Sequence, residues 1–174
     1  QGGFFSAMFR KMFGGESFFL GKYEHPDGGK LTFAPSVPGS VQHYQLSNNS
    51  INIMAGAFLA CTPGVSVKAK FGGFKALFSG EGAFLLEVSG NGDLFFNSFG
   101  GIVEKEINGD FIVDTGHVVA FEPSLTYKIS GMGNWKSTML SGEGLVMTFS
   151  GVGKIYLQTR TIDGIASWLT PRLI

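Results

Sequence analysis

Residues 79–97 have the sequence SGEGAFLLEVSGNGDLFFN, and residues 141–159 have the sequence SGEGLVMTFSGVGKIYLQT. Both stretches open with Ser-Gly-Glu-Gly, enter an apolar run, pass a second Ser-Gly-x-Gly and continue into another apolar run. A tight turn between two such runs needs backbone angles that glycine adopts at low cost. Each stretch therefore predicts a β-hairpin, with its turn at 89–92 or 150–153. A fainter copy covers 14–33, with a turn at 27–29.

A second unit also repeats between the hairpins. Each residue of 113–120 (VDTGHVVA) lies 60 positions after its counterpart in 53–60 (IMAGAFLA), and each copy is followed by a proline. We interpret these units as arches between strands. Together the two patterns predict one repeat-built β domain over 1–174, with sub-repeats at about 14–70, 79–130 and 141–160. Three hairpins but only two arches also predict an upstream segment of the natural protein with the pattern apolar-x-x-Gly-x-apolar-apolar-Ala.

Apolar and polar residues alternate with period two through most of the chain. The alternation is clear at 65–70, 125–129 and 145–150. Because successive side chains of a strand point to opposite faces, this pattern predicts short strands in an all-β, antiparallel sandwich or prism. Only the two ends favour helix: an amphipathic one at 4–13, and a short one at 164–169 with Asp163 as its N-cap.

The composition excludes several function classes. The chain has 174 residues, no formal net charge and only 15% charged residues, so it lacks the positive field that attracts nucleic acid. A modest basic strip is formed by Lys68, Lys70 and Lys75, but we expect the nearby phenylalanines to pack in the core. The single cysteine, Cys61, permits no intramolecular disulfide and favours a reducing compartment. We expect a cytoplasmic prokaryotic protein, or a mitochondrial one in a eukaryote.

Few residues have the spacing of a chemical site. Asp114 and His117 lie three positions apart, and an acidic turn residue such as Glu143 can be brought near them to bind a divalent ion weakly. The alternative is structural: Asp114 stabilises a turn, and His117 hydrogen-bonds a backbone carbonyl near the arch. We favour the structural interpretation. Cys61 ends an apolar run with no base in view, and no nucleophile elbow or phosphate loop is present. We therefore predict a non-enzyme without a cofactor.

Several motifs in one order resemble a known family. They are GESFF at 15–19, GAFLA at 56–60, VDTGHVVA at 113–120, SGEG at 141–144 and QTR at 158–160. They resemble an uncharacterised family of prokaryotes and mitochondria that includes the altered-inheritance-of-mitochondria biogenesis protein. The resemblance implies a fold like that of the tryptophan RNA-binding attenuator protein, which is a short double-stranded β-helix with internal duplication. It also implies oligomerisation, but no reaction and no catalytic residues.

We predict that the protein is a non-catalytic, homo-oligomeric β-scaffold that binds other macromolecules. Phenylalanines at 71–74 and 95–99 occupy both faces of their strands, so a second subunit is expected to cover one face. The near-threefold repetition suggests a cyclic trimer. Two alternatives stay open: a cupin-like protein with a small-ligand or metal site at Asp114 and His117, and a peripheral membrane protein attached through 4–13.

Overall fold

The computed structural model describes residues 20–71, 84–131 and 145–173. The chain divides into two compact units, Gln1–Thr32 and Phe33–Ile174. In the first unit, residues 20–32 contain no helix or strand, and a turn at 26–27 is closed by the Gly28 N–H, which donates to the His25 carbonyl over 3.1 Å. The predicted turn at 27–29 is thus close to the observed one, but the strand predicted to follow it at 31–33 is not formed. The predicted helix at 4–13 lies outside the described residues.

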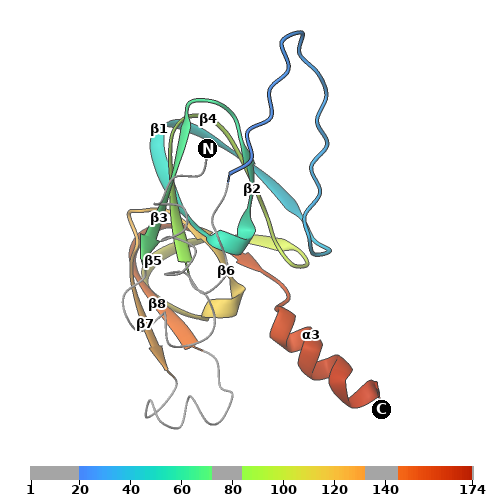
Figure 1. Ribbon diagram of the computed structural model, residues 1–174. Helices are drawn as coiled ribbons and strands as arrows, with labels where there is room; N and C mark the ends of the chain where they lie inside the picture. The colour runs from blue at the N-terminus through green and yellow to red at the C-terminus, as the bar shows by residue number, and fades with distance from the viewer. Residues whose placement is uncertain (1–19, 72–83, 132–144, 174) are drawn as a thin grey trace, which may run out of the picture. The chain divides into compact units, whose positions relative to one another are not determined.

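The second unit contains the strands, and its two halves have the same order of elements. The first half consists of β1 (Val41–Met54), the short 3-10 helix η1 (Ala55–Ala57), β2 (Phe58–Cys61), β3 (Val65–Phe71) and β4 (Phe84–Asn97). The second half consists of β5 (Ile102–Asp114), η2 (Thr115–His117), β6 (Val118–Phe121), β7 (Thr126–Gly131) and β8 (Leu145–Gln158). Each predicted arch corresponds to one of the two 3-10 helices with the short strand that follows it (Figure 1).

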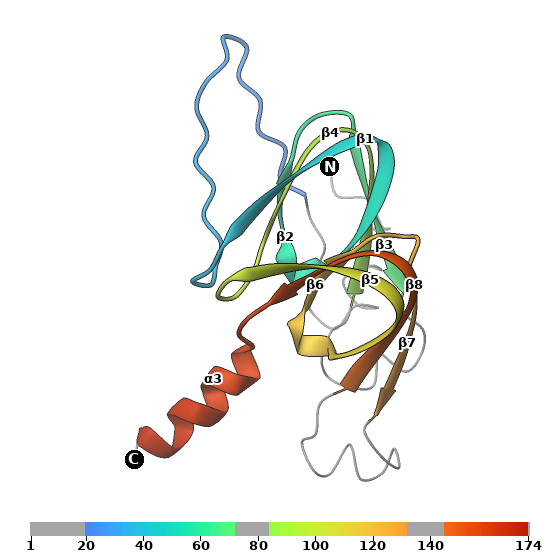
Figure 2. The same cartoon turned by 180° about the vertical axis from the view of Figure 1, so that it is seen from behind.

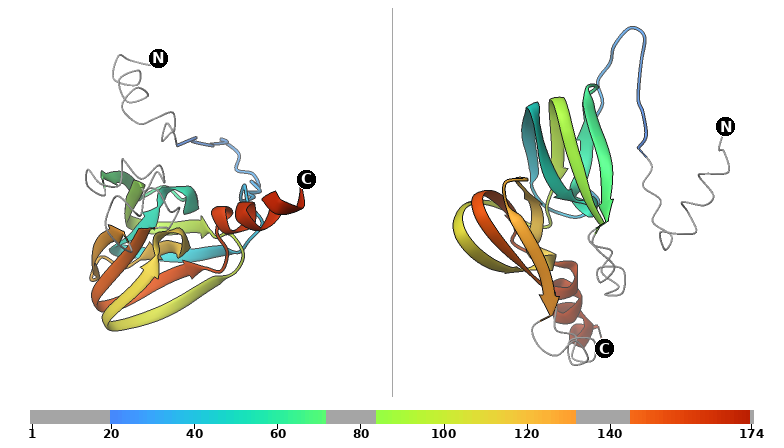
Figure 3. Two further views of the ribbon diagram at one scale, coloured as in Figure 1. Left: turned by 90° about the horizontal axis from the view of Figure 1, so that it is seen from below. Right: turned by 90° about the vertical axis from the view of Figure 1, so that its left-hand side faces the viewer.

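The strands form one antiparallel sheet in the order β2-β4-β1-β6-β8-β5, with β3 beside β4 and β7 beside β8. The sheet bends into two layers, β3-β4-β1 and β5-β8-β7, which the right-hand view of Figure 3 shows separately. The layers are joined where Asn52 and Ile53 of β1 pair with Phe121 and Ala120 of β6. The all-β, antiparallel class predicted from the alternation is confirmed.

The two Ser-Gly-x-Gly segments are not hairpin turns, and that prediction was wrong. β4 runs without a break through 89–92, and β8 runs without a break through 150–153. Both strands bend there instead. Opposite the bend in β4, the register of β1 shifts between Ser47 and Asn49, and Asn48 adopts a φ of 57°. Such a bulge increases the local twist of a strand.

Glycine is required at this bend because another backbone lies against it. A Cβ atom on Gly90 would lie 2.2 Å from the carbonyl oxygen of Gly64, and Gly90 has a φ of 126°. Both conditions exclude a side chain. A tight turn and a close backbone approach thus make the same demand on sequence, which explains why the pattern was mistaken for a turn.

Each long strand contributes to two hydrophobic clusters because successive side chains point to opposite faces of the sheet. In β4, Leu85 belongs to the second cluster, whereas Leu94 and Phe96 belong to the first. In β8, Phe149 belongs to the second cluster and Tyr156 to the first. Each long strand therefore fastens the two clusters together, and burial of such large side chains supplies about 1.5–3 kcal/mol each.

The C-terminal helix was predicted correctly, but its cap was not. Helix α3 (Ile162–Leu169) follows β8, and a 3-10 turn, η3 (Thr170–Arg172), follows the helix (Figure 2). The Thr161 hydroxyl accepts a 3.0 Å hydrogen bond from the Gly164 N–H, so Thr161 rather than Asp163 is the N-cap. The carboxylate of Asp163 lies in the first turn, where the helix dipole favours it. No helix in the described part of the chain is long and apolar enough to cross a membrane.

Candidate functional site

The residues singled out as a potential metal site hold the η2 turn. The Asp114 side chain accepts a 2.7 Å hydrogen bond from the Gly116 N–H at the start of η2. The Nδ1 atom of His117 lies 2.7 Å from the carbonyl oxygen of Gln158. A carbonyl only accepts, so Nδ1 carries the proton and donates. The predicted hydrogen bond from His117 to a backbone carbonyl is therefore present.

The third candidate ligand cannot be placed beside them. Glu143 lies outside the described residues. Within the described ranges, no group of three or more His, Cys, Asp and Glu side chains is arranged to hold a metal ion. Asp114 and His117 are neighbours on one turn, and each already has a partner within the fold.

Gln158 organises the same region, although no local sequence pattern indicates this role. Its Nε2 donates to the Gly116 carbonyl over 2.7 Å, and its Oε1 accepts from the Phe99 N–H over 2.9 Å. The next residue, Thr159, accepts from the Gly101 N–H over 2.8 Å. The motif at 158–160 therefore fastens the β4–β5 connection to η2. The partners of this motif lie far away in the sequence. Gln158 and Phe99, for example, are 59 positions apart.

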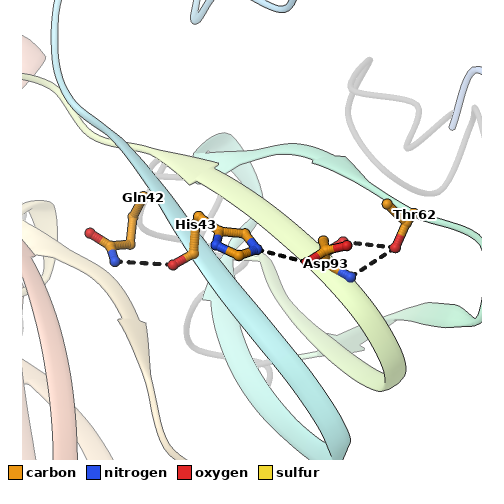
Figure 4. Close-up of polar contacts among 4 residues, drawn as sticks. All are labelled: Gln42, His43, Thr62 and Asp93. Atoms are coloured by element: carbon orange, nitrogen blue, oxygen red, sulfur yellow. Dashed lines mark hydrogen bonds and ion pairs between the residues drawn. The ribbon is translucent and has the colours of Figure 1, made fainter.

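An exposed polar pair lies on the first layer, between β1 and β4. The His43 Nε2 atom lies 2.8 Å from the Asp93 Oδ1 atom, and both side chains are substantially exposed (Figure 4). The His43 ring also stacks on the Phe95 ring, with centroids 5.1 Å apart. Fifty residues separate His43 from Asp93. Only the β1–β4 register brings them together, so no spacing in the sequence indicates the pair.

A His–Asp pair acts as a general base when it lies against a nucleophile. The nearby hydroxyl in Figure 4 belongs to Thr62, but it is directed to the Asp93 backbone. Its Oγ1 accepts from the Asp93 N–H over 2.8 Å, and the Thr62 N–H donates to the Asp93 carbonyl over 2.9 Å. Thr62 therefore attaches the β2–β3 connection to β4, and its hydroxyl is not placed as a nucleophile beside the His43 imidazole.

Two tyrosines face each other where the layers meet. The rings of Tyr44 on β1 and Tyr156 on β8 make an edge contact, with centroids 6.3 Å apart. Burial raises the pKa of Tyr156, and the nearby Glu104 carboxylate raises it further. Burial also raises the pKa of Tyr44, with Glu122 as the next cause. Both shifts favour the neutral phenol, and both rings pack in or against the first hydrophobic cluster.

Lys154 is the cation beside these tyrosines. Its Nζ atom lies 2.6 Å from Glu104 Oε1, and its backbone N–H donates to Glu122 Oε2 over 2.8 Å. The hydrogen bond to Glu104 raises the pKa of Lys154. Burial raises the pKa of the half-buried Cys61 thiol, which packs against the first hydrophobic cluster.

Five strands present open hydrogen-bonding edges within the described ranges, and the shortest of them, β2, is paired only with β4. β3 is paired only with β4, and β5 and β7 are paired only with β8. β1 is paired with β4 along its length but with β6 only at Asn52 and Ile53. The longest of these edges, β5, has 13 residues. Unpaired N–H and C=O groups along such an edge are a template for another chain.

The open edges of β3 and β5 carry opposite charge. β3 has the sequence VSVKAKF, with Lys68 and Lys70 exposed and no acidic residue. β5 has the sequence IVEKEINGDFIVD and carries four acidic residues against one lysine. Its exposed acidic side chains include Glu104, Glu106 and Asp110. The two edges are thus electrostatically complementary.

The chain matches the model of the mitochondrial biogenesis AIM24 family over residues 1–160. It is 34% identical over 166 residues to an uncharacterised protein of Streptococcus pyogenes serotype M6, and this match covers 94% of the chain and 67% of the relative. The fold is similar to the crystal structure of a Streptococcus pyogenes protein, with a TM-score of 0.70 and 31% identity. That match covers 80% of this chain and 62% of the solved one, so this chain spans less than two thirds of its length.

The family resemblance seen in the motifs at 56–60, 113–120 and 141–144 is therefore confirmed by a match that extends over most of the chain. The similarity of fold, at more than 30% identity, agrees with it. The chain belongs to the mitochondrial biogenesis AIM24 family.

Proposed function

We propose that the protein is a non-catalytic, homo-oligomeric β-scaffold that acts by binding other macromolecules. The observation that carries the proposal is the set of edges left open among the described strands, on β1, β2, β3, β5 and β7. Natural proteins cover long strand edges, and assembly with further copies is one way to do so. A cyclic trimer is the arrangement we expect, in a prokaryotic cytoplasm or in a mitochondrion.

Exposed apolar side chains along the second layer support the proposal. Val103 and Ile112 on β5 are 48% and 65% exposed, and Val152 on β8 is 66% exposed. These strands are adjacent, since Asn108 of β5 is opposite Val152. Single exposed apolar residues are ordinary on a protein surface. Their position beside the longest open edge supports the proposal that this layer is a contact surface.

The finer features of the fold belong to the same proposal. Residues 41–97 and 102–158 contain the same succession of a long strand, a 3-10 helix, two shorter strands and a long strand. We infer that these halves are internal repeats of a short double-stranded β-helix like that of the tryptophan RNA-binding attenuator protein. Ring formation would extend the repetition from one subunit to the next.

The mass of the assembly in solution tests the proposal. Light scattering after gel filtration measures this mass, and metal analysis of the same peak detects a bound ion. A metal-free oligomer, with a trimer expected, supports the scaffold. A monomer contradicts it.

The same sample tests the alternative of a metal-binding, cupin-like protein. Stoichiometric metal that is lost in His117→Ala would establish that alternative and would displace the scaffold proposal. We expect no such metal, because Asp114 and His117 already bond the η2 turn and Gln158. Membrane attachment through residues 4–13 is tested by co-sedimentation with liposomes, with and without that segment.

A further inference from the structure

We infer that neighbouring subunits join head to tail, with the open edge of β2 in one copy pairing antiparallel with the open edge of β5 in the next copy. The inference rests on the proposed homo-oligomer and names the contact that builds it. In the strand order β2-β4-β1-β6-β8-β5, β2 and β5 are the two ends of the sheet. Among the described strands, β2 is paired only with β4, and β5 only with β8.

The subunit already contains one junction of this kind, between its two halves. There the long first strand of one half, β1, pairs antiparallel with β6, the short strand that follows the 3-10 helix of the other half. The two halves have the same order of elements, so β5 is the counterpart of β1, and β2 is the counterpart of β6. Pairing of the two ends of the sheet would therefore repeat the existing junction between one copy and the next.

The internal repeat gives the register of the proposed contact. The short strands β2 and β6 begin and end 60 positions apart, and each shifts its register against its long partner strand at the same place. The same offset carries the two junction residues of β1 to Ile112 and Val113 on β5, and those of β6 to Ala60 and Cys61 on β2. Ile112 is therefore expected opposite Cys61, and Val113 opposite Ala60.

The faces of the two strands agree with this register. At the existing junction, Ile53 belongs to the first hydrophobic cluster and Phe121 to the second, and the two residues lie in successive pairs, so they point to opposite faces of the sheet. At the proposed junction, Val113 packs against the second cluster and Cys61 against the first, again in successive pairs. Each side chain thus keeps the direction that its own half of the sheet already gives it.

Burial differs between the existing junction and the two open ends. All four residues of β6 are buried, whereas all four residues of β2 are only half-buried, although both strands are apolar (VVAF and FLAC). On β1, Asn52 and Ile53 are 6% and 0% exposed, whereas their counterpart Ile112 on β5 is 65% exposed and Val113 is half-buried. The ends therefore have the apolar residues of a junction without its cover, and a second copy supplies that cover.

A disulfide cross-link on the full chain tests the contact and its register. Cys61 is the single cysteine of the chain. Residues directly opposite each other in an antiparallel pair have Cα atoms about 4.5–5.5 Å apart, which a disulfide can bridge. We expect Ile112→Cys, treated with a mild oxidant, to form a disulfide with Cys61 of the next copy. A non-reducing gel should then show covalent species up to the trimer, which a reducing agent returns to the monomer.

The matched control is Asn108→Cys, an exposed position on the same face of the same strand. It lies four positions from Ile112, or about 13 Å along the strand, so no cross-link is expected. A second pair of variants measures the strength of the contact. Ile112→Asp is expected to weaken assembly about tenfold to a hundredfold, because it places a charge in an apolar contact, and Asn108→Asp is expected to have little effect. Light scattering over a concentration series measures both, and circular dichroism verifies that each variant is folded.

The outcomes separate this contact from other assemblies. A cross-link of Ile112→Cys that persists when Cys61→Ser is added would establish a contact between two copies of β5 and overturn the inference. An oligomeric Ile112→Cys protein that forms no disulfide with Cys61 also overturns it, while leaving the proposed scaffold in place. A monomeric wild type overturns both.

Discussion

Tyr156 illustrates how a single side chain acquires its properties from the folded chain. Its position in the sequence, within the run IYL at 155–157, identifies it only as a strand residue. In the fold it is 4% exposed, contacts the rings of Tyr44 and Phe96, and lies near the carboxylate of Glu104. Burial and this carboxylate both favour the neutral phenol, which raises the pKa of Tyr156.

The raised pKa of Tyr156 predicts a loss of stability in alkaline solution. The unfolded chain releases this phenolic proton near pH 10, whereas the folded chain retains it to higher pH. Below about pH 10 the group has no effect on the slope of stability against pH. Above it, the free energy of unfolding is expected to fall by at most about 1.4 kcal/mol per pH unit, because only the unfolded state is ionised.

Urea unfolding at a series of pH values between 8 and 11 measures this effect. Tyr156→Phe is expected to reduce the slope above pH 10, since phenylalanine does not ionise. Glu104→Gln keeps the size of the side chain, removes the charge and is expected to reduce the slope in part. Equal slopes in the wild type and in Tyr156→Phe would contradict the assignment.

At the scale of the element, glycines determine where the long strands bend. Gly90 and Gly151, in β4 and β8, have φ values of 126° and 123°. A Cβ atom on Gly90 would lie 2.2 Å from the Gly64 carbonyl oxygen, and one on Gly151 would lie 3.2 Å from the Ser124 carbonyl oxygen. The bends thus coincide with the entry to β3 and β7, whose backbones approach most closely at these glycines.

Substitution at the bend of β4 is therefore expected to be costly. Gly90→Ala combines a positive φ with a collision against backbone, and we expect it to lower the free energy of unfolding by more than about 2 kcal/mol. Gly109→Ala has a φ of 112° but open space around the Cβ, so about 1–2 kcal/mol is expected. Gly56→Ala has neither obstacle and is expected to be near neutral. Chemical denaturation ranks the three variants, and a Gly90→Ala protein as stable as Gly56→Ala would contradict the account.

At the scale of the whole β unit, two hydrophobic clusters are joined by shared strands. β4 contributes to both clusters, β8 contributes to both, and β1 pairs with β6 between the layers. A layer of three strands needs an apolar face packed against other elements in order to be stable. We therefore expect the two layers to unfold as one cooperative unit rather than in succession.

Phe149→Ala tests this cooperativity. Phe149 is fully buried in the second cluster and makes an edge contact with Phe121, so its removal is expected to cost about 3–5 kcal/mol. Hydrogen exchange measured by mass spectrometry should then show faster exchange in β1 and β4 as well as in β5–β8. Lys128→Ala, at an exposed position on β7, is the control and is expected to change stability by less than about 0.5 kcal/mol. Faster exchange confined to the second layer would contradict the prediction.

Local sequence pattern was sufficient for the class of the fold and for many of its elements. The alternation at 65–70 and 125–129 corresponds to β3 and β7, and the arches correspond to η1 and η2. The terminal helix and the family likeness were also recognised. These features depend on neighbours within a few residues or on motifs in fixed order, because strand and helix periods are local properties of the chain.

Features that depend on contacts between distant residues were settled by the fold alone. Ser-Gly-x-Gly at 89–92 is compatible with a turn or a bend, and the position of the Gly64 carbonyl selects the bend. The His43–Asp93 pair requires the register of β1 against β4, and the role of Gln158 requires η2 to lie beside β8. The open edges of β3 and β5 depend on the order of strands in the sheet. These partners lie at irregular distances along the chain, and only the packing of the whole β unit brings them together. No short sequence pattern therefore indicates them.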